Sequence, residues 1–178
     1  MKEILPIVQL GSPILREIAL PIRDIQAPEI EELIDDLIST CMQAKGMGIA
    51  APQLSHSKRI FIMVSAPNER YPHAPYMEPT VIINPEILYA SDELEKNWEG
   101  CLSLPGLRAL VPRSIAIRVC YQQPNGEKVF KEFKGFLARI FLHEFDHLDG
   151  KVFIDRVKST LDIVMEQEYQ SIVKTTII

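Results

Sequence analysis

Features typical of secreted, membrane and nucleic-acid-binding proteins are scarce in this sequence. It has three cysteines, Cys41, Cys101 and Cys120, whose odd number and wide spacing argue against a disulfide framework and for a reducing compartment. No apolar run is long enough to cross a bilayer, and charged residues interrupt the N-terminal segment, so we expect neither a membrane span nor a secretory signal. The 19 Lys and Arg residues are outnumbered by 24 Asp and Glu residues, and the net charge of −5 argues against nucleic acid as a ligand. We therefore predict a cytoplasmic protein with neither a membrane nor a nucleic-acid partner.

The length and composition fit one globular domain. The chain has 178 residues, of which 47% are hydrophobic and 24% charged. One domain usually takes about 100 to 200 residues. No repeat, low-complexity run or linker interrupts the chain, so we expect residues 1–178 to form a single domain.

The periodicity of the apolar residues predicts an α+β fold. Helical spacing predicts helices over 28–45, 136–148 and 159–174, with Gly150 as the C-terminal cap of the second and Ser159 as the N-cap of the third. Runs rich in Ile, Val and Phe predict antiparallel strands over 59–64, 80–89, 114–121 and 127–133. The segments 46–53 and 66–79 are predicted to be loops. We expect antiparallel β-sheets around a central metal-binding helix, with one helix in the N-terminal half and one at the C-terminus.

Two histidines four residues apart are the first candidates for chemistry. In His143-Glu144-Phe145-Asp146-His147 both imidazoles lie on one face of the predicted helix, because four residues make about one helical turn. Two metal ligands can converge in this way. Glu144 follows the first histidine and can act as a general base on a water molecule, so the segment predicts a hydrolytic metal site.

The third metal ligand distinguishes between classes of hydrolase. A metzincin protease would need a histidine at the position of Phe153, which cannot bind metal, so that class is excluded. A thermolysin-like protease would take a carboxylate from a following helix, and Glu166 or Glu168 lies at a suitable separation. Cys101 is the other candidate, since its thiolate would complete a His, His, Cys set with a fourth position open. The residues alone leave the carboxylates and Cys101 as alternatives.

Three segments together resemble the signature motifs of the peptide deformylases. They are residues 46–53 (GMGIAAPQ), 99–103 (EGCLS) and 143–147 (HEFDH), in the family's order and at comparable separations. The resemblance extends to residues 83–85 and 105–113 and so covers most of 10–157. One position departs from the family pattern, because Leu142 stands where a Gln usually precedes the first histidine. That change bears on the tuning of the site more than on the reaction.

The resemblance implies a reaction, a partner and a cofactor. It implies a metal-dependent hydrolase that removes the formyl group from the N-terminal formyl-methionine of newly synthesised proteins and releases formate. The partner is then a formyl-methionyl peptide or nascent chain. The implied cofactor is one divalent metal ion, Fe²⁺ in the first place and Zn²⁺, Ni²⁺ or Co²⁺ as alternatives. The implied roles are metal ligand for Cys101, His143 and His147, general base for Glu144, and donor to the developing oxyanion for Gln53 and the Leu102 N–H.

Candidates for substrate binding surround this predicted centre. The methionine side chain is an unbranched thioether that apolar walls hold best, and the candidates for those walls are Met47, Phe136, Ile140 and His143. Gly48 leaves its backbone free to pair with an extended peptide. The complete set of substrate-binding candidates is Gly46, Met47, Gly48, Glu99, Gly100, Arg108, Phe136 and Ile140. Arg113 or Arg108 is expected to pair with Asp146 behind the metal ligands.

Two other functions are compatible with these residues. One is the thermolysin-like metalloprotease with Glu166 or Glu168 as third ligand, for which Cys101 would be dispensable. The other is a non-catalytic relative that binds formyl-methionyl peptide without releasing formate, although the presence of Glu144 and Gln53 argues against it. A ribosome-docking role is not expected from the C-terminal helix, because acidic residues dilute its basic ones.

Overall fold

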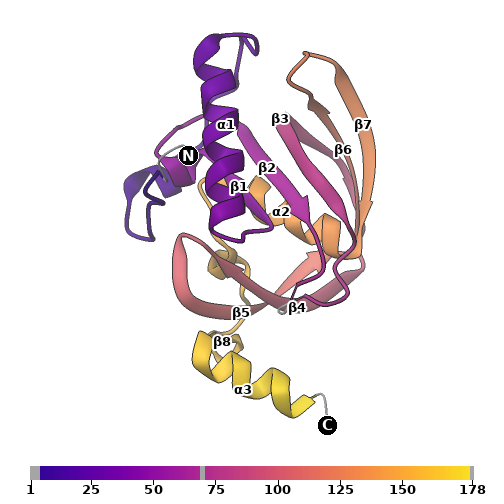
Figure 1. Cartoon of the computed structure of the whole chain (residues 1–178). Helices are drawn as coiled ribbons and strands as arrows, with labels where there is room; N and C mark the ends of the chain where they lie inside the picture. Colours follow the sequence, from indigo (N-terminus) through magenta and orange to yellow (C-terminus); the bar gives the residue numbers. More distant parts are fainter. Residues whose placement is uncertain (1–4, 69–70, 177–178) are drawn as a thin grey trace.

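Two antiparallel sheets lie on either side of one helix, α2 (Figure 1). The computed structural model describes residues 5–68 and 71–176, and within these ranges the larger sheet has the strand order β1-β2-β3-β6-β7 and the smaller sheet β4-β5-β8. None of the helices in these ranges combines the length and apolar character that a membrane crossing requires. The strands are β1 (Gly48–Ala50), β2 (Ile60–Ser65), β3 (Met77–Ala90), β4 (Leu94–Cys101), β5 (Leu104–Ser114), β6 (Ala116–Gln122), β7 (Lys128–Lys134) and β8 (Ile163–Met165). The α-helices are α1 (Pro28–Gln43), α2 (Gly135–Leu148) and α3 (Glu166–Thr176).

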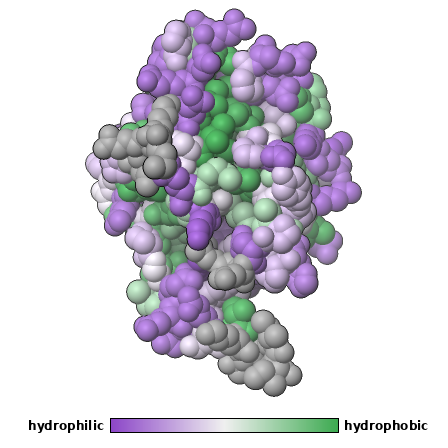
Figure 2. All heavy atoms as spheres, viewed as in Figure 1, coloured by the Kyte–Doolittle hydropathy of each residue, from purple (hydrophilic) through white to green (hydrophobic). Residues whose placement is uncertain are grey.

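Helix α1 covers the outer face of the larger sheet. Pro28 occupies its first turn, where the missing N–H costs nothing, and Ile30, Leu33 and Leu37 are buried at helical spacing. These side chains pack against Ile60 and other residues of β1 and β2. Figure 2 shows apolar side chains gathered where α1 meets the sheet, within a face that is otherwise mostly polar. The helix predicted over 28–45 is confirmed, and it ends two residues earlier than predicted.

The inner face of the larger sheet packs against α2. Phe61 of β2 meets Phe141 of α2 edge to face, with ring centroids 5.2 Å apart, and Phe133 of β7 packs on the same ring. The predicted strands correspond to β2, β3, β6 and β7, and the predicted central helix to α2. Since one side of α2 is buried against the sheet, its other side is left to carry polar residues.

The glycine after α2 fixes how the chain leaves that helix. Gly150 has φ of +68°, and a Cβ there would lie 2.6 Å from the carbonyl oxygen of Arg16. Asp149 and Ile18 form an isolated bridge at the same place. The end of α2, and with it His147, is thereby held against the N-terminal segment.

The strand content was underestimated in several places. Residues 48–50 were predicted to be in a loop but form β1, which pairs with β2 through Gly48↔Met63 and Ala50↔Phe61. A three-residue edge strand is too short to show a period of two among small residues. The strands β4 and β5 were not predicted either. In β5, Pro105, Gly106 and Pro112 interrupt the alternation of apolar and polar residues. Strand β3 begins at Met77, inside the predicted loop 66–79.

The predicted start of the C-terminal helix at 159 was wrong. Ser159 does act as a cap, since its side chain accepts a hydrogen bond from the Leu161 N–H, but it caps only a short 3-10 turn. Residues 163–165 then form β8, which pairs with β5 through Leu107↔Met165 and Ala109↔Ile163. The β-branched Ile163 and Val164 fit a strand with an available partner better than a helix. Helix α3 therefore begins at Glu166.

Candidate metal centre

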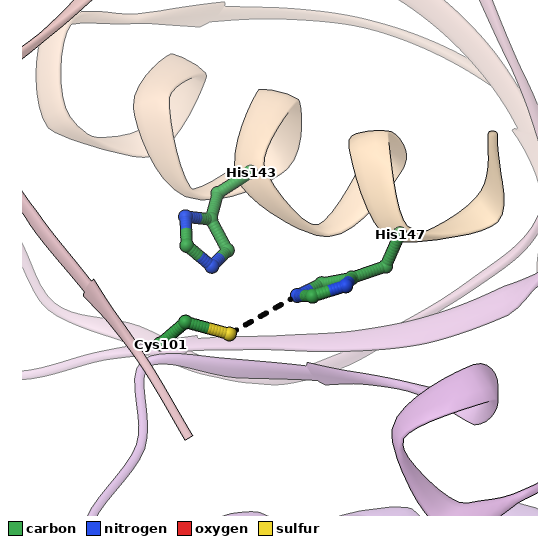
Figure 3. A group of neighbouring side chains, drawn as sticks. All are labelled: Cys101, His143 and His147. Carbon is green, nitrogen blue, oxygen red and sulfur yellow. Dashed lines mark hydrogen bonds between the residues drawn. The ribbon is translucent and has the colours of Figure 1, made fainter. Parts of the chain in front are cut away.

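A thiol and two imidazoles meet between the smaller sheet and α2 (Figure 3). His143 and His147 project from consecutive turns of α2 toward Cys101 at the end of β4. The Cys101 Sγ lies 3.3 Å from His147 Nε2, and one ligand atom from each of the three residues falls within 4.8 Å of the others. Among residues 5–68 and 71–176, this is the one group of three or more His, Cys, Asp or Glu side chains that could hold a metal ion.

The chemistry of these donors fits a divalent metal ion. Burial by itself raises the pKa of the Cys101 thiol, but His147 and His143 outweigh burial and lower the pKa to about 5, so the sulfur is a thiolate at neutral pH. A thiolate and two imidazoles are ligands that first-row divalent metals accept. The site also contains a buried carboxylate oxygen, Oε2 of Glu144, that makes no hydrogen bond within the described chain. Cys101, His143 and His147 thus form a ligand set for a divalent metal ion.

Glu99 fixes the orientation of the first histidine. Its Oε2 lies 2.9 Å from His143 Nδ1, so Nε2 of that ring is left to face Cys101. Burial raises the pKa of the Glu99 carboxyl, but Arg113 and His143 outweigh burial and hold the pKa far below its usual range. Arg139 adds a hydrogen bond of 2.8 Å to Oε1. Glu99 is therefore a charged carboxylate that orients a ligand.

Arg113 joins Glu99 to the carboxylate of Asp146. Its Nε and Nη2 contact Glu99 at 2.9 Å and 3.0 Å, and its Nη1 lies 2.6 Å from Asp146 Oδ2. Arg156 also donates hydrogen bonds to Asp146. Of the two arginines predicted as partners of Asp146, the structure places Arg113 there. Arg108 pairs with Glu166 instead.

Gln53 is held with its amide nitrogen toward the ligand set. Its Oε1 accepts a hydrogen bond of 2.8 Å from the Ala50 N–H, which leaves Nε2 facing Ser103 Oγ at 3.2 Å and Cys101 Sγ at 3.6 Å. The side chain is 1% exposed, so neighbouring atoms restrict its rotation. A fixed amide donor beside the ligand set can stabilise negative charge that develops on a substrate oxygen.

Glu144 lies beside the ligand set against the backbone of β1. Burial raises the pKa of this carboxyl to about 7. A Cβ on Gly48 would lie 2.5 Å from Glu144 Oε1, so only glycine leaves room for the carboxylate in this position. The position of the Glu144 carboxylate therefore explains why the segment 46–53 has a glycine at residue 48.

Gly48→Ala is expected to reduce hydrolysis by displacing Glu144. The added methyl group overlaps the carboxylate, and a shift of about 1 Å in a catalytic group can cost up to about a hundredfold in rate. We expect kcat to fall by about tenfold or more while metal content stays at the wild-type value. The temperature of unfolding is the control, since a fall in kcat that merely follows a loss of folded protein would contradict this account.

A cavity of ≈ 1180 Å³ opens beside the ligand set. The predicted substrate-binding residues that line it are Gly46, Met47, Gly48, Glu99, Gly100, Arg108, Phe136 and Ile140. Gln53, Leu102 and Glu144 line it as well, whereas Arg113 and Asp146 lie behind the ligands. Sequence reasoning did not identify Arg139, Tyr71, Trp98 or Tyr169, which also line the cavity. Arg139 was detectable as a charge one turn before His143 in an otherwise apolar stretch of the helix.

Neither of the carboxylates proposed as an alternative third ligand belongs to the ligand set. Glu166 pairs with Arg108 on the smaller sheet, and Glu168 is exposed on α3. Within the described chain the third donor near the two imidazoles is the sulfur of Cys101. The thermolysin-like arrangement is therefore not favoured.

Comparison with known proteins identifies relatives of this fold and site. The family model described as polypeptide deformylase matches residues 4–162. "Peptide deformylase 2" of Nostoc sp. is 54% identical over 171 residues, which cover 96% of each chain, and "Peptide deformylase 2" of Shewanella oneidensis is 45% identical over 92% of this chain and 90% of its own. A Met-Ala-Ser-bound class I type b peptide deformylase from Acinetobacter baumannii aligns with a TM-score of 0.86 at 43% identity, over 88% of this chain and 100% of its own. Peptide deformylase from Thermotoga maritima aligns with a TM-score of 0.79 at 37% identity, over 89% and 100%.

Proposed function

The chain belongs to the polypeptide deformylase family, so its reaction is the hydrolysis of the formyl group of N-terminal formyl-methionine, and we propose that Glu144 is the general base of that hydrolysis. The observation that carries this proposal is the position of the Glu144 carboxylate. It is buried beside Cys101, His143 and His147, it lines the cavity, and one of its oxygens makes no hydrogen bond within the described residues. Such a carboxylate can receive a proton from a water molecule in the cavity.

Cys101, His143 and His147 would hold a divalent ion, which would supply positive charge to acidify water and polarise the formyl oxygen. We propose Fe²⁺ as the ion, since a thiolate ligand set accepts it, with Zn²⁺, Ni²⁺ or Co²⁺ as substitutes. Glu99 supports this role by keeping the His143 ring in one tautomer.

Glu144 transfers one proton twice in this scheme. It takes the proton from water as the oxygen attacks the formyl carbon, and it returns the proton to the amine as the carbon–nitrogen bond breaks, because the amine has to leave as a neutral group. A pKa raised to about 7 suits both steps, since neither protonation state is then strongly disfavoured near neutral pH.

Gln53 and Leu102 stabilise the negative charge that forms on the formyl oxygen. The Gln53 Nε2 is held toward Cys101 by the bond between its Oε1 and the Ala50 N–H. The backbone N–H of Leu102 follows Cys101 directly, and Leu102 lines the cavity. Fixed donors of this kind need no reorganisation when charge develops.

The methionine side chain occupies the apolar part of the cavity. Met47, Phe136 and Ile140 supply walls suited to an unbranched thioether. The edge strand β1 pairs with β2 on one side only among the described strands, so its other edge at Gly48 can accept the main chain of an extended peptide.

Residues from distant parts of the chain line one cavity, the first of them Lys45 and the last Val173, which supports a single catalytic domain. Cys41, Cys101 and Cys120 are all free of disulfide bonds, which supports a reducing compartment such as the cytoplasm. We do not include ribosome docking, because α3 begins with two acidic residues, Glu166 and Glu168.

Formate release from formyl-Met-Ala-Ser tests the proposed function. The full chain loaded with ferrous iron in the absence of oxygen is expected to release formate equal to the peptide consumed. The unformylated peptide is the control and should remain unchanged. Cleavage between Met and Ala, or binding of the formylated peptide with no formate released, would contradict the proposal.

A further inference from the structure

Helix α3 contributes to the cavity that contains the ligand set. Glu166, Tyr169, Gln170 and Val173 line this cavity together with Cys101 and the other residues of the metal centre. Because i, i+3, i+4 and i+7 positions share one face of a helix, these four residues form a continuous stripe on α3. None of these four residues is a metal ligand, the general base, an oxyanion donor or part of the methionine pocket.

Arg108 connects this stripe to the ligand set. Its guanidinium lies against Gly100, where a Cβ would be 2.2 Å from Nη1, and Gly100 precedes Cys101 in the chain. On the other side Arg108 pairs with Glu166 and lies over the Tyr169 ring, with 5.3 Å between Cζ and the ring centroid. Trp98 meets the same ring at a centroid distance of 5.3 Å. The wall of the cavity therefore runs from Cys101 through Arg108 to α3 without a break.

The start of α3 is held in place by the smaller sheet. Strand β8 pairs with β5 through Arg108↔Val164 and Leu107↔Met165, and Glu166 is the next residue. Tyr169 is 7% exposed, so its ring is packed between Trp98 and Arg108. A helix anchored at these points presents its stripe to the cavity in a fixed position.

On the basis of the proposed function, we propose that the stripe on α3 binds the part of the substrate that follows formyl-methionine. Arg108 lies between Gly100, next to the ligand Cys101, and Glu166 and Tyr169 of α3. An extended chain advances about 3.3 Å per residue, so a peptide whose formyl group lies at the ligand set would meet α3 with residues that follow the first. The Arg108 charge is balanced by Glu166, which leaves the phenol ring of Tyr169, the amide of Gln170 and the apolar Val173. The stripe therefore suits uncharged side chains at the second and third positions of the peptide.

Trp98 provides a direct measure of binding at this wall. It is the one tryptophan in the sequence, and its ring contacts Tyr169. Titration of the metal-loaded full chain with Met-Ala-Ser is expected to change the tryptophan emission, whereas free methionine should leave it nearly unchanged. Gln170→Ala is expected to weaken Met-Ala-Ser binding by about threefold and Tyr169→Ala by about tenfold, the effects of losing one hydrogen bond and one aromatic contact.

The matched control is Gln167→Ala, the same substitution on an exposed position of α3 that does not line the cavity. For Gln170→Ala we expect kcat/KM to fall with formyl-Met-Ala-Ser and to stay within twofold of wild type with formyl-methionine amide, mainly through KM. Equal losses on both substrates would overturn the proposal, because Gln170 would then act through the metal centre, and no loss on either would overturn it as well. If wild type binds Met-Ala-Ser with a change in emission but releases no formate from formyl-Met-Ala-Ser, the proposed function fails while the binding role of α3 stands.

Discussion

Glu144→Gln is expected to lower kcat for formate release by at least about a hundredfold while the metal stays bound. Glutamine keeps the size of the side chain but cannot take a proton from water, and a general base contributes about 10² to 10⁴ in rate. The three ligands are not altered, since Glu144 is not a member of the Cys101, His143, His147 set. The measurement is formate release from formyl-Met-Ala-Ser beside metal content by elemental analysis.

The control for that substitution is Glu168→Gln. It removes a carboxylate of the same type from an exposed position on α3 and should leave both kcat and metal content at wild-type values. A Glu144→Gln protein that hydrolyses the substrate at the wild-type rate would show that another group is the base. Loss of metal from that variant would instead show that Glu144 contributes to metal binding.

The environments of two buried carboxylates explain why Glu144 and not Glu99 is assigned as the base. Glu99 accepts hydrogen bonds from Arg113, Arg139 and His143, which keep it charged and occupy its oxygens. No arginine of the described residues pairs with Glu144, and burial raises its pKa to about 7. Two carboxylates at one site with opposite shifts in pKa are suited to different tasks. Glu99 orients a ligand, and Glu144 is left to exchange a proton.

The helices were predictable because their apolar periodicity is strong. The segment 28–43 repeats buried residues at helical spacing from Pro28 onward, and residues 136–148 do the same around the two histidines. Residues 163–165 were placed in a helix for a different reason. Ile163 and Val164 fit an apolar stripe, but pairing with residues 107–109 on β5 determines their structure, and a periodicity argument contains no information about a strand partner.

The metal ligands were partly predictable from the sequence. The spacing of His143 and His147 on one helix fixes their proximity locally, whereas the choice between Cys101 and the carboxylates of α3 depends on how distant segments pack. The same applies to Glu99, which was assigned to substrate binding and lies against His143 Nδ1 as well as lining the cavity. The contacts of Arg139 and Tyr169 join residues more than 25 positions apart in sequence, so no local pattern signals them.

Cys101→Ala is expected to remove most of the bound metal and with it the formate release. The thiolate is one of three protein donors, and loss of a residue that merely orients a ligand already costs about tenfold to a hundredfold in metal affinity, so loss of the ligand itself should cost at least about a hundredfold. Cys120→Ala is the matched control, because Cys120 is a free cysteine on β6 opposite Phe130 and lies outside the ligand set.

Metal content after dialysis against a weak chelator distinguishes the possible third ligands. Cys120→Ala and Glu166→Gln should retain metal as wild type does, since Glu166 pairs with Arg108 and not with the histidines. Cys101→Ala should lose metal at chelator concentrations that leave the other two proteins loaded. If Cys101→Ala kept its metal and Glu166→Gln lost it, the sulfur would not be the third ligand, and the assignment of this centre to deformylase chemistry would be wrong.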